Sequence, residues 1–113
     1  MHLSFISTRG QAGLDAPSVT VEVHLSAGLP AFQVVGLRDS NSREIRSRVR
    51  AALISSHLKW PDFNITANLT PAERVTPATR FDLPIAMGLL VASQQLPRDA
   101  IEGREFIGEL GLD

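Results

Sequence analysis

The stretch TPATRFDLPIAMGLL, residues 76–90, begins as a polar loop with a proline and continues directly into an apolar helical pattern. Loops that lead into a buried helix can hold phosphates or present a nucleophile. A hydroxyl nucleophile needs a base beside it, and a lysine of lowered pKa can be that base. The nearest hydroxyls are those of Thr76 and Thr79, and the only lysine of the chain is Lys59. Positions 77–88 contain neither serine nor lysine, so we expect this loop to be non-catalytic.

No other cluster of residues has the spacing of a cofactor or metal site. The eight glycines never form the phosphate-binding pattern G-x-x-x-x-G-K-[ST]; residues 103–108, GREFIG, have the first spacing, but Glu109 stands where lysine is needed. The three histidines are scattered, and we interpret His24 and His57 as solvated residues. The lack of cysteine excludes disulfides, thiolate zinc sites and a cysteine nucleophile. We therefore expect no catalytic residue, no cofactor and no metal in this chain.

An arginine-rich helix is the clearest candidate for a contact with a charged partner. With Ile45 facing the core, helical periodicity places three arginines together on the far side of the helix: Arg43, Arg46 and Arg50. Arg48 then flanks the apolar stripe. Three guanidinium groups on one face suit phosphate binding, so a nucleic-acid contact is one interpretation. The other is a solvated face with local ion pairs, or a contact with another domain, and both interpretations stay open here.

The tripeptide Arg80-Phe81-Asp82 is a second candidate. In one interpretation Arg80 and Asp82 form a subunit or ligand contact. In the other, Asp82 stabilises the N-terminus of the following helix through the helix dipole, while Phe81 packs in the core. We favour the second interpretation. We also expect Trp60 to fill the core at a turn, because a tryptophan at a turn after a helix packs in the core more often than it stacks on bases.

The composition is that of an ordinary globular domain. A length of 113 residues suffices for one domain with a buried core, and 43% hydrophobic against 20% charged residues is the usual balance of a soluble protein. The formal net charge of −1 gives no global attraction to nucleic acid or to an anionic membrane. The chain has neither a signal-peptide pattern nor an apolar run of about 18 residues. We expect a cytoplasmic protein with no membrane partner.

The first third of the chain predicts strands. Residues 2–8 and 18–25 are short and rich in β-forming residues, and in the second segment valines alternate with polar residues, which is typical of a half-exposed strand. Residues 31–37, AFQVVGL, are mostly apolar and predict a third, central strand. An antiparallel meander of these three strands is the simplest arrangement.

The hydrophobic period then becomes helical. The segment 41–56 has its apolar residues at the spacing of one helix face: Ile45, Val49, Ala52 and Leu53. Asn41 followed by Glu44 resembles a capping box at the start of this helix.

The remaining elements complete an α+β pattern. Residues 64–71 alternate as a fourth strand, a helix follows over 81–94 with Pro84 in its first turn, and EFIGELGL, residues 105–112, predicts a last strand. This order predicts an α+β fold with a mixed sheet and two helices. Because a last strand with no following element has an open edge, the chain looks cut within a domain. We therefore expect it to self-associate, most simply as a dimer, by edge pairing or by swapping a terminal element.

Five stretches together resemble the amino-terminal region of the Mg-chelatase-like ATPases of the ComM (YifB) type: VTVEVHLSAGLPAFQVVGL, RVRAALISS, NITANLTPA, RFDLPIAMGLL and FIGELGLD. The resemblance covers the whole chain without an obvious gap. It implies that residues 1–113 are the first part of a single Lon-protease-like domain, of the superfold named after the second domain of a ribosomal protein, placed ahead of an AAA+ ATPase module. It also implies a hexamer that uses ATP and Mg²⁺, and for the competence-linked members a role in DNA branch migration.

The loop at residues 76–79 departs from the pattern of this family. Family members carry Lys-Glu-Gly-Gly before Arg-Phe-Asp-Leu-Pro, whereas this chain has Thr-Pro-Ala-Thr. Lon proteases present the serine of a serine–lysine pair at about this place. Because this loop has neither serine nor lysine, we expect it to be a non-catalytic relic. Two glycines and a lysine are lost as well, and glycines permit the close approach of the backbone to an anion. The resemblance therefore does not assign the family's use of this loop to this chain.

The resemblance implies a non-catalytic accessory domain that serves assembly, coupling or substrate guidance of an ATPase. Its expected partners are the AAA+ module of its own chain and identical subunits. Two other functions remain as alternatives. One is a DNA-binding module that uses Arg43, Arg46 and Arg50, and the other is a divergent peptidase, against which the missing serine and lysine argue.

Overall fold

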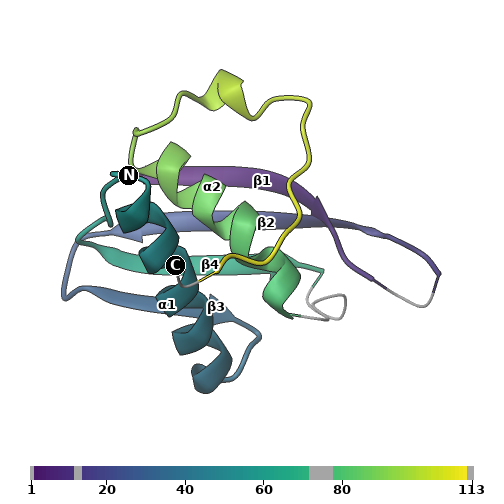
Figure 1. Ribbon diagram of the computed structural model, residues 1–113, viewed down its shortest axis with the longest axis horizontal. Helices are drawn as coiled ribbons and strands as arrows, with labels where there is room; N and C mark the ends of the chain where they lie inside the picture. Colours follow the sequence, from purple (N-terminus) through teal and green to yellow (C-terminus); the bar gives the residue numbers. More distant parts are fainter. Residues whose placement is uncertain (1, 12–13, 72–77, 112–113) are drawn as a thin grey trace.

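In the part of the chain that the structure describes, four strands form one sheet, and two α-helices lie against one of its faces (Figure 1). The computed structural model describes residues 2–11, 14–71 and 78–111. Along the chain the elements are β1 (His2–Arg9), β2 (Ser18–Ser26), β3 (Ala31–Val35), α1 (Asp39–Ser55), β4 (Asn64–Thr70), the 3₁₀ turn η2 (Ala78–Phe81), α2 (Asp82–Ala92) and the 3₁₀ turn η3 (Arg98–Ala100). The α+β class with a mixed sheet and two helices is confirmed.

The order of the strands in the sheet is β1-β2-β4-β3. β1 pairs with β2 and β2 pairs with β4 in antiparallel fashion, whereas β3 and β4 are parallel. The predicted three-stranded meander and the central position of β3 are therefore wrong. The physical reason is the place of α1 in the chain. A helix between two strands carries the chain back across the sheet, so β3 and β4 run parallel, and β4 inserts between β2 and β3.

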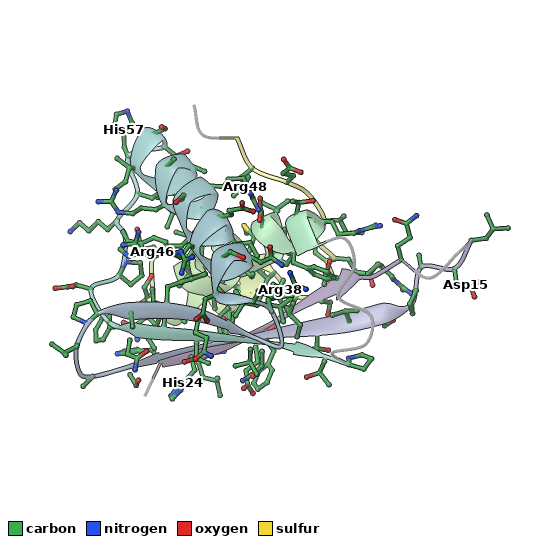
Figure 2. All side chains as sticks on the ribbon, turned by 90° about the horizontal axis from the view of Figure 1, so that it is seen from below. Asp15, His24, Arg38, Arg46, Arg48 and His57 are labelled. Atoms are coloured by element: carbon green, nitrogen blue, oxygen red, sulfur yellow. The ribbon has the colours of Figure 1, made fainter. Side chains whose placement is uncertain are left out.

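The buried face of the sheet follows the period-two pattern of its strands. Four apolar residues of β2 are at most 2% exposed, as their alternation predicts: Val19, Val21, Val23 and Leu25. They join the apolar sides of α1 and α2 in one hydrophobic core. On the opposite face of the sheet, His24 points away from both helices (Figure 2).

Helix α1 has the predicted apolar face but a different start. It begins at Asp39, and its N-cap residue Arg38 makes no side-chain cap hydrogen bond. The predicted capping box of Asn41 and Glu44 is therefore wrong, and Asp39 in the first turn provides the favourable charge at this helix end instead. Three residues of the predicted apolar face are buried, Ile45, Val49 and Leu53, and the fourth, Ala52, is partly buried.

At the outer edge of β3, the main-chain groups of Val34 are paired with residues outside the sheet. Ser42 of α1 is buried, and its Oγ accepts a hydrogen bond from the amide of Val34 at 3.2 Å. The carbonyl of Val34 accepts one from the amide of Leu37 at 3.3 Å. Both main-chain groups of Val34 are thus paired outside the sheet, which lowers the tendency of this edge to recruit another strand.

Helix α2 is fixed closely against β1 and β2. It begins at Asp82, directly after η2, and Pro84 lies in its first turn as predicted. A Cβ atom at Gly88 would meet Cγ2 of Val23 at 2.5 Å, so only glycine allows this approach. The carbonyl of Gly88 also accepts a hydrogen bond from Ser4 Oγ at 2.7 Å. Within the described ranges, no helix has the length and apolar character needed to cross a membrane.

The predicted last strand at residues 105–112 does not form over residues 105–111, the part of it that the structure describes. Glu105 forms a single β-bridge with Ser7 of β1, and the chain then leaves the edge of the sheet. It passes across the helix side of the molecule near the start of α2 (Figure 1). We call residues 105–110 the strap. Its Gly108 pairs with main-chain groups of Arg80 and Leu83, which draws the chain away from β1 and prevents further strand pairing.

Candidate functional site

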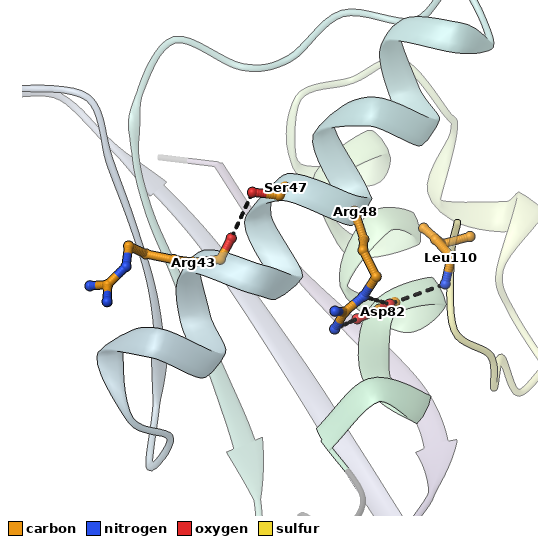
Figure 3. A network of polar contacts seen from close by, with 5 residues as sticks. All are labelled: Arg43, Ser47, Arg48, Asp82 and Leu110. Carbon is orange, nitrogen blue, oxygen red and sulfur yellow. Dashed lines mark hydrogen bonds and ion pairs between the residues drawn. The ribbon is translucent and has the colours of Figure 1, made fainter. Parts of the chain in front are cut away.

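Helix α1 presents the predicted arginines to solvent. Arg43, Arg46 and Arg50 are all exposed, whereas Arg48 is only partly exposed and lies on another side of the helix. Figure 3 shows Arg43 pointing away from Arg48, with the helix between their side chains. The sequence-predicted positions of these four arginines around the helix are therefore confirmed. Which partner the exposed arginines contact stays a prediction.

The three exposed arginines make no ion pair with any residue of the described ranges. In those ranges ion pairs join Arg9 to Glu105 and Arg48 to Asp82. Exposed guanidinium groups without a carboxylate partner remain available for an external anion. We call Arg43, Arg46 and Arg50 the arginine face.

One member of the arginine face has an aromatic neighbour. The guanidinium carbon of Arg46 lies 5.5 Å from the ring centroid of Trp60, within the range of a cation–π contact. The Trp60 ring is also tilted against Phe32, with 5.8 Å between the ring centroids. Trp60 is partly buried and packs against the hydrophobic core. The prediction that Trp60 fills the core is confirmed, and its contact with Arg46 restrains that side chain.

Arg48 and Asp82 form a buried ion pair between the two helices (Figure 3). Nε of Arg48 donates to Oδ2 of Asp82 at 2.6 Å, and Nη2 donates to Oδ1 at 3.2 Å. The side chain of Asp82 is 0% exposed and that of Arg48 is 15% exposed. Oδ2 of Asp82 accepts a further hydrogen bond from the amide of Leu110 at 3.0 Å. One carboxylate thus connects α1, α2 and the strap.

Burial sets the acidity of this carboxyl group. Removal from water raises the pKa of Asp82, because it disfavours the charged form, while the hydrogen bonds from Arg48 and Leu110 act in the opposite direction. The hydrogen bond to Asp82 in turn raises the pKa of Arg48, against the effect of its own burial. A perturbed acid can indicate a functional site, but structural ion pairs perturb pKa values as well. Here both oxygens of Asp82 have partners from the protein itself, which favours a structural role.

Arg80 and Asp82, the two charged residues of the candidate tripeptide, have different partners within the chain, and a subunit or ligand contact stays a prediction. Asp82 points inward to Arg48, whereas Nη1 of Arg80 donates to Oε1 of Gln11, which follows β1, at 3.0 Å. Phe81 between them is 0% exposed and belongs to the core, as predicted. Asp82 is the first residue of α2, so its predicted place at a helix N-terminus is confirmed.

Sequence reasoning missed Arg48 as the partner of Asp82. The available signal was its position beside the apolar stripe of α1, where a charged side chain borders the core and needs a partner. Thr76 and Pro77, in the loop that departs from the family pattern, lie outside the described residues. Within the described part of the chain, no three histidine or carboxylate side chains gather as a metal site.

Comparison with known proteins places the chain in a family. Residues 21–113 match the family model described as subunit ChlI of Mg-chelatase. The chain is 46% identical over 112 residues to the protein YifB of Escherichia coli K12 and to the competence protein ComM of Haemophilus influenzae, in each case over 99% of this chain and 22% of the relative. A protein of Mycobacterium tuberculosis H37Rv is 37% identical over 101 residues, 89% of this chain and 20% of the relative.

The chain therefore spans about a fifth of the length of the curated relatives it matches. The family model covers most of the chain, from the second half of the β1–β2 hairpin through both helices and the strap. On this match, the chain belongs to the family of Mg-chelatase subunit ChlI and is similar to YifB and ComM.

Proposed function

We propose that this chain is a non-catalytic accessory domain of a Mg-chelatase-like ATPase, and that it serves assembly, coupling or substrate guidance. Membership of the ChlI family and the short share of the relatives that it spans support this proposal. In the proposal, residues 1–113 are the first part of a Lon-like domain. The AAA+ module that binds ATP and Mg²⁺ lies elsewhere in the protein, and identical subunits and that module are the partners. The relative ComM is named a competence protein, and the proposal gives the whole protein a role in competence, of the DNA branch-migration type that the family resemblance implies.

One geometric observation carries the non-catalytic part of the proposal. The side chain of Gln95, which follows the C-terminal end of α2, accepts a hydrogen bond from the amide of Lys59 and donates one to its carbonyl. Lys59 is the only lysine of the chain. Thr79 lies before the opposite end of this 11-residue helix. Such a helix is about 16 Å long, whereas a serine–lysine type of pair needs contact at about 3 Å. The lysine and the nearest described hydroxyl of the loop therefore belong to opposite ends of α2.

The test compares the whole ATPase with a version that lacks residues 1–113. We expect ATP hydrolysis to persist in the shortened protein, while assembly or DNA-dependent work is impaired. The 113-residue chain by itself should show no micromolar ATP binding in isothermal titration and should not digest casein. ATP turnover or proteolysis by this chain would contradict the proposal.

A second candidate function rests on the arginine face. Arg43, Arg46 and Arg50 are exposed and have no carboxylate partner among the described residues, which favours phosphate contacts. The test measures binding of single-stranded and junction DNA as salt is raised. Changing all three arginines to glutamine should weaken binding for all sequences and lower the salt slope by about one unit for each lost phosphate contact.

A matched control keeps this DNA test specific. Arg104 is exposed and lies outside α1, between η3 and the strap, so Arg104→Gln removes a positive charge of the same kind from a different surface. Single changes on the arginine face should each reduce the salt slope, whereas Arg104→Gln should leave it unchanged. Equal effects of Arg43→Gln and Arg104→Gln would show a general charge effect and reject the arginine face as a DNA contact.

A further inference from the structure

The strap is attached with little burial of its own side chains. None of residues 105–110 is fully buried, and Ile107 is 43% exposed. Phe106 and Leu110 are partly buried against the core. Segments with few buried apolar contacts open locally at a lower free energy than the core. The strap is therefore expected to open without unfolding of the sheet.

Alternate residues of the strap provide its main-chain attachments. These are Phe106 N to Ser7 O at 3.0 Å, Gly108 N to Arg80 O at 3.1 Å, Leu83 N to Gly108 O at 3.0 Å, and Leu110 N to Asp82 Oδ2 at 3.0 Å. The bond at Leu110 is the only one of these four that has a charged acceptor, and hydrogen bonds to charged groups are stronger than neutral ones.

Asp82 makes this charge-assisted main-chain attachment dependent on α1. The other charged attachment of the strap is the exposed ion pair of Glu105 with Arg9. The same oxygen, Oδ2, accepts hydrogen bonds from Arg48 and from Leu110. The carboxylate is inaccessible to water, so without Arg48 it must take up a proton or become hydrated. Glu109 of the strap and Glu44 of α1 are the other charged groups whose fields act on the pair. Protonation or hydration of Asp82 weakens its bond to Leu110, so the state of the ion pair controls the strap.

We propose that the Arg48–Asp82 pair is the latch of the strap. While the pair is formed, Asp82 holds Leu110 and keeps the strap closed over the start of α2. When the pair is broken, the strap opens as a unit, and the amide of Leu83 and the carbonyl of Ser7 lose their strap partners. A free amide at a helix start and a free carbonyl at a strand edge are groups that bind other segments. The latch is independent of the accessory function proposed above.

Amide hydrogen exchange followed by NMR tests the latch in the unaltered chain. The amides of Phe106, Gly108 and Leu110 should exchange through a local opening, at rates that respond little to low denaturant concentrations. The amides of Val21 and Ile65 in the central strands should exchange only through global unfolding. If strap and central amides share one exchange rate and one denaturant dependence, the strap does not open separately and the proposal is overturned.

The variant Arg48→Gln tests the role of the pair. It should raise exchange of the Leu110, Gly108 and Leu83 amides by roughly tenfold or more over the unaltered chain, through a local opening that responds little to low denaturant concentrations. Arg50→Gln removes a charge from the exposed side of the same helix and should leave these rates unchanged. If the strap amides of Arg48→Gln exchange only through global unfolding, with the denaturant dependence of the central amides, the pair supports only global stability and the latch is overturned. Should Arg48→Gln fail to fold, the measurement on the unaltered chain still decides.

Discussion

Nε of Arg48 lies 2.6 Å from Oδ2 of Asp82, so two residues separated by 34 positions in the chain lock α1 to α2. Each charge is held where water cannot replace its partner, since Asp82 is 0% exposed and Arg48 only 15% exposed. The attraction offsets a large desolvation cost, so the pair contributes more to the arrangement of the two helices than to net stability.

Replacing one partner of the pair should destabilise the fold strongly. In Arg48→Met the carboxylate of Asp82 loses its countercharge in a buried site, and the free energy of unfolding should fall by about 3 kcal/mol. Urea unfolding followed by circular dichroism measures this change. The control Arg50→Met on the exposed side of α1 should stay within about 0.5 kcal/mol of the unaltered chain. A loss below about 1 kcal/mol in Arg48→Met would show that Asp82 is solvated there.

The carboxyl group of Asp82 should titrate above the ordinary range for aspartate. Because burial raises its pKa in the folded state, the folded chain binds more protons than the unfolded chain between the two pKa values. The stability contribution of Asp82 is therefore fully present below the ordinary pKa and is lost as the pH rises through the raised one. Carbon-13 NMR of the carboxyl group measures the pKa, and Arg48→Gln should raise it further. A pKa below the ordinary value would show that the hydrogen bonds outweigh burial.

Adding one methyl group at Gly88 should separate α2 from the sheet. The new Cβ would lie 2.5 Å from Cγ2 of Val23, a buried side chain in the central part of the core. Overpacking of this kind costs about 1–3 kcal/mol, which exceeds the gain of roughly 1 kcal/mol in helix propensity. Thermal unfolding of Gly88→Ala should show the loss. In Gly108→Ala the added atom meets Leu83 at an ordinary 3.7 Å, so this control should be close to neutral.

Removing the hydroxyl of Ser42 should open the edge of the sheet at β3. Ser42→Ala leaves the amide of Val34 without its hydrogen-bond acceptor, and exposed strand edges recruit other strands. Sedimentation at tens of micromolar should show more self-association than for the unaltered chain. The control is Ser47→Ala, because Ser47 Oγ donates only within α1, to the carbonyl of Arg43 (Figure 3). Identical sedimentation of all three proteins would show that this bond does not protect the edge.

Local patterns in the sequence predicted the elements better than their arrangement. The alternation in β2 and the apolar spacing of α1 are set by neighbours within one element, and the structure confirms both. The position of β4 between β2 and β3 depends on pairing between distant segments, which no local period encodes. The strap has a local strand pattern, but bonds to Arg80, Leu83 and Asp82 override it.

The candidate site was likewise predictable only where one helix determines it. The exposure of Arg43, Arg46 and Arg50 follows from helical geometry alone, and it was predictable. The pairing of Arg48 with Asp82 requires α1 to pack beside α2, so it became visible only in the folded chain. The expected dimer rested on a last strand that is absent from residues 105–110, and self-association stays a prediction whose candidate edge is now β3.

The central place of β4 makes assembly of the sheet depend on a late segment of the chain. Among the strands of the described residues, β4 is the one neighbour of β3, and β2 meets β3 through it. Until residues 64–70 are available, β1 and β2 can form a local hairpin, while β3 and α1 have no sheet to join. Formation of β4 therefore brings both halves of the sheet together in one step of high contact order. During synthesis, the first 60 residues should remain incompletely folded until β4 has left the ribosome.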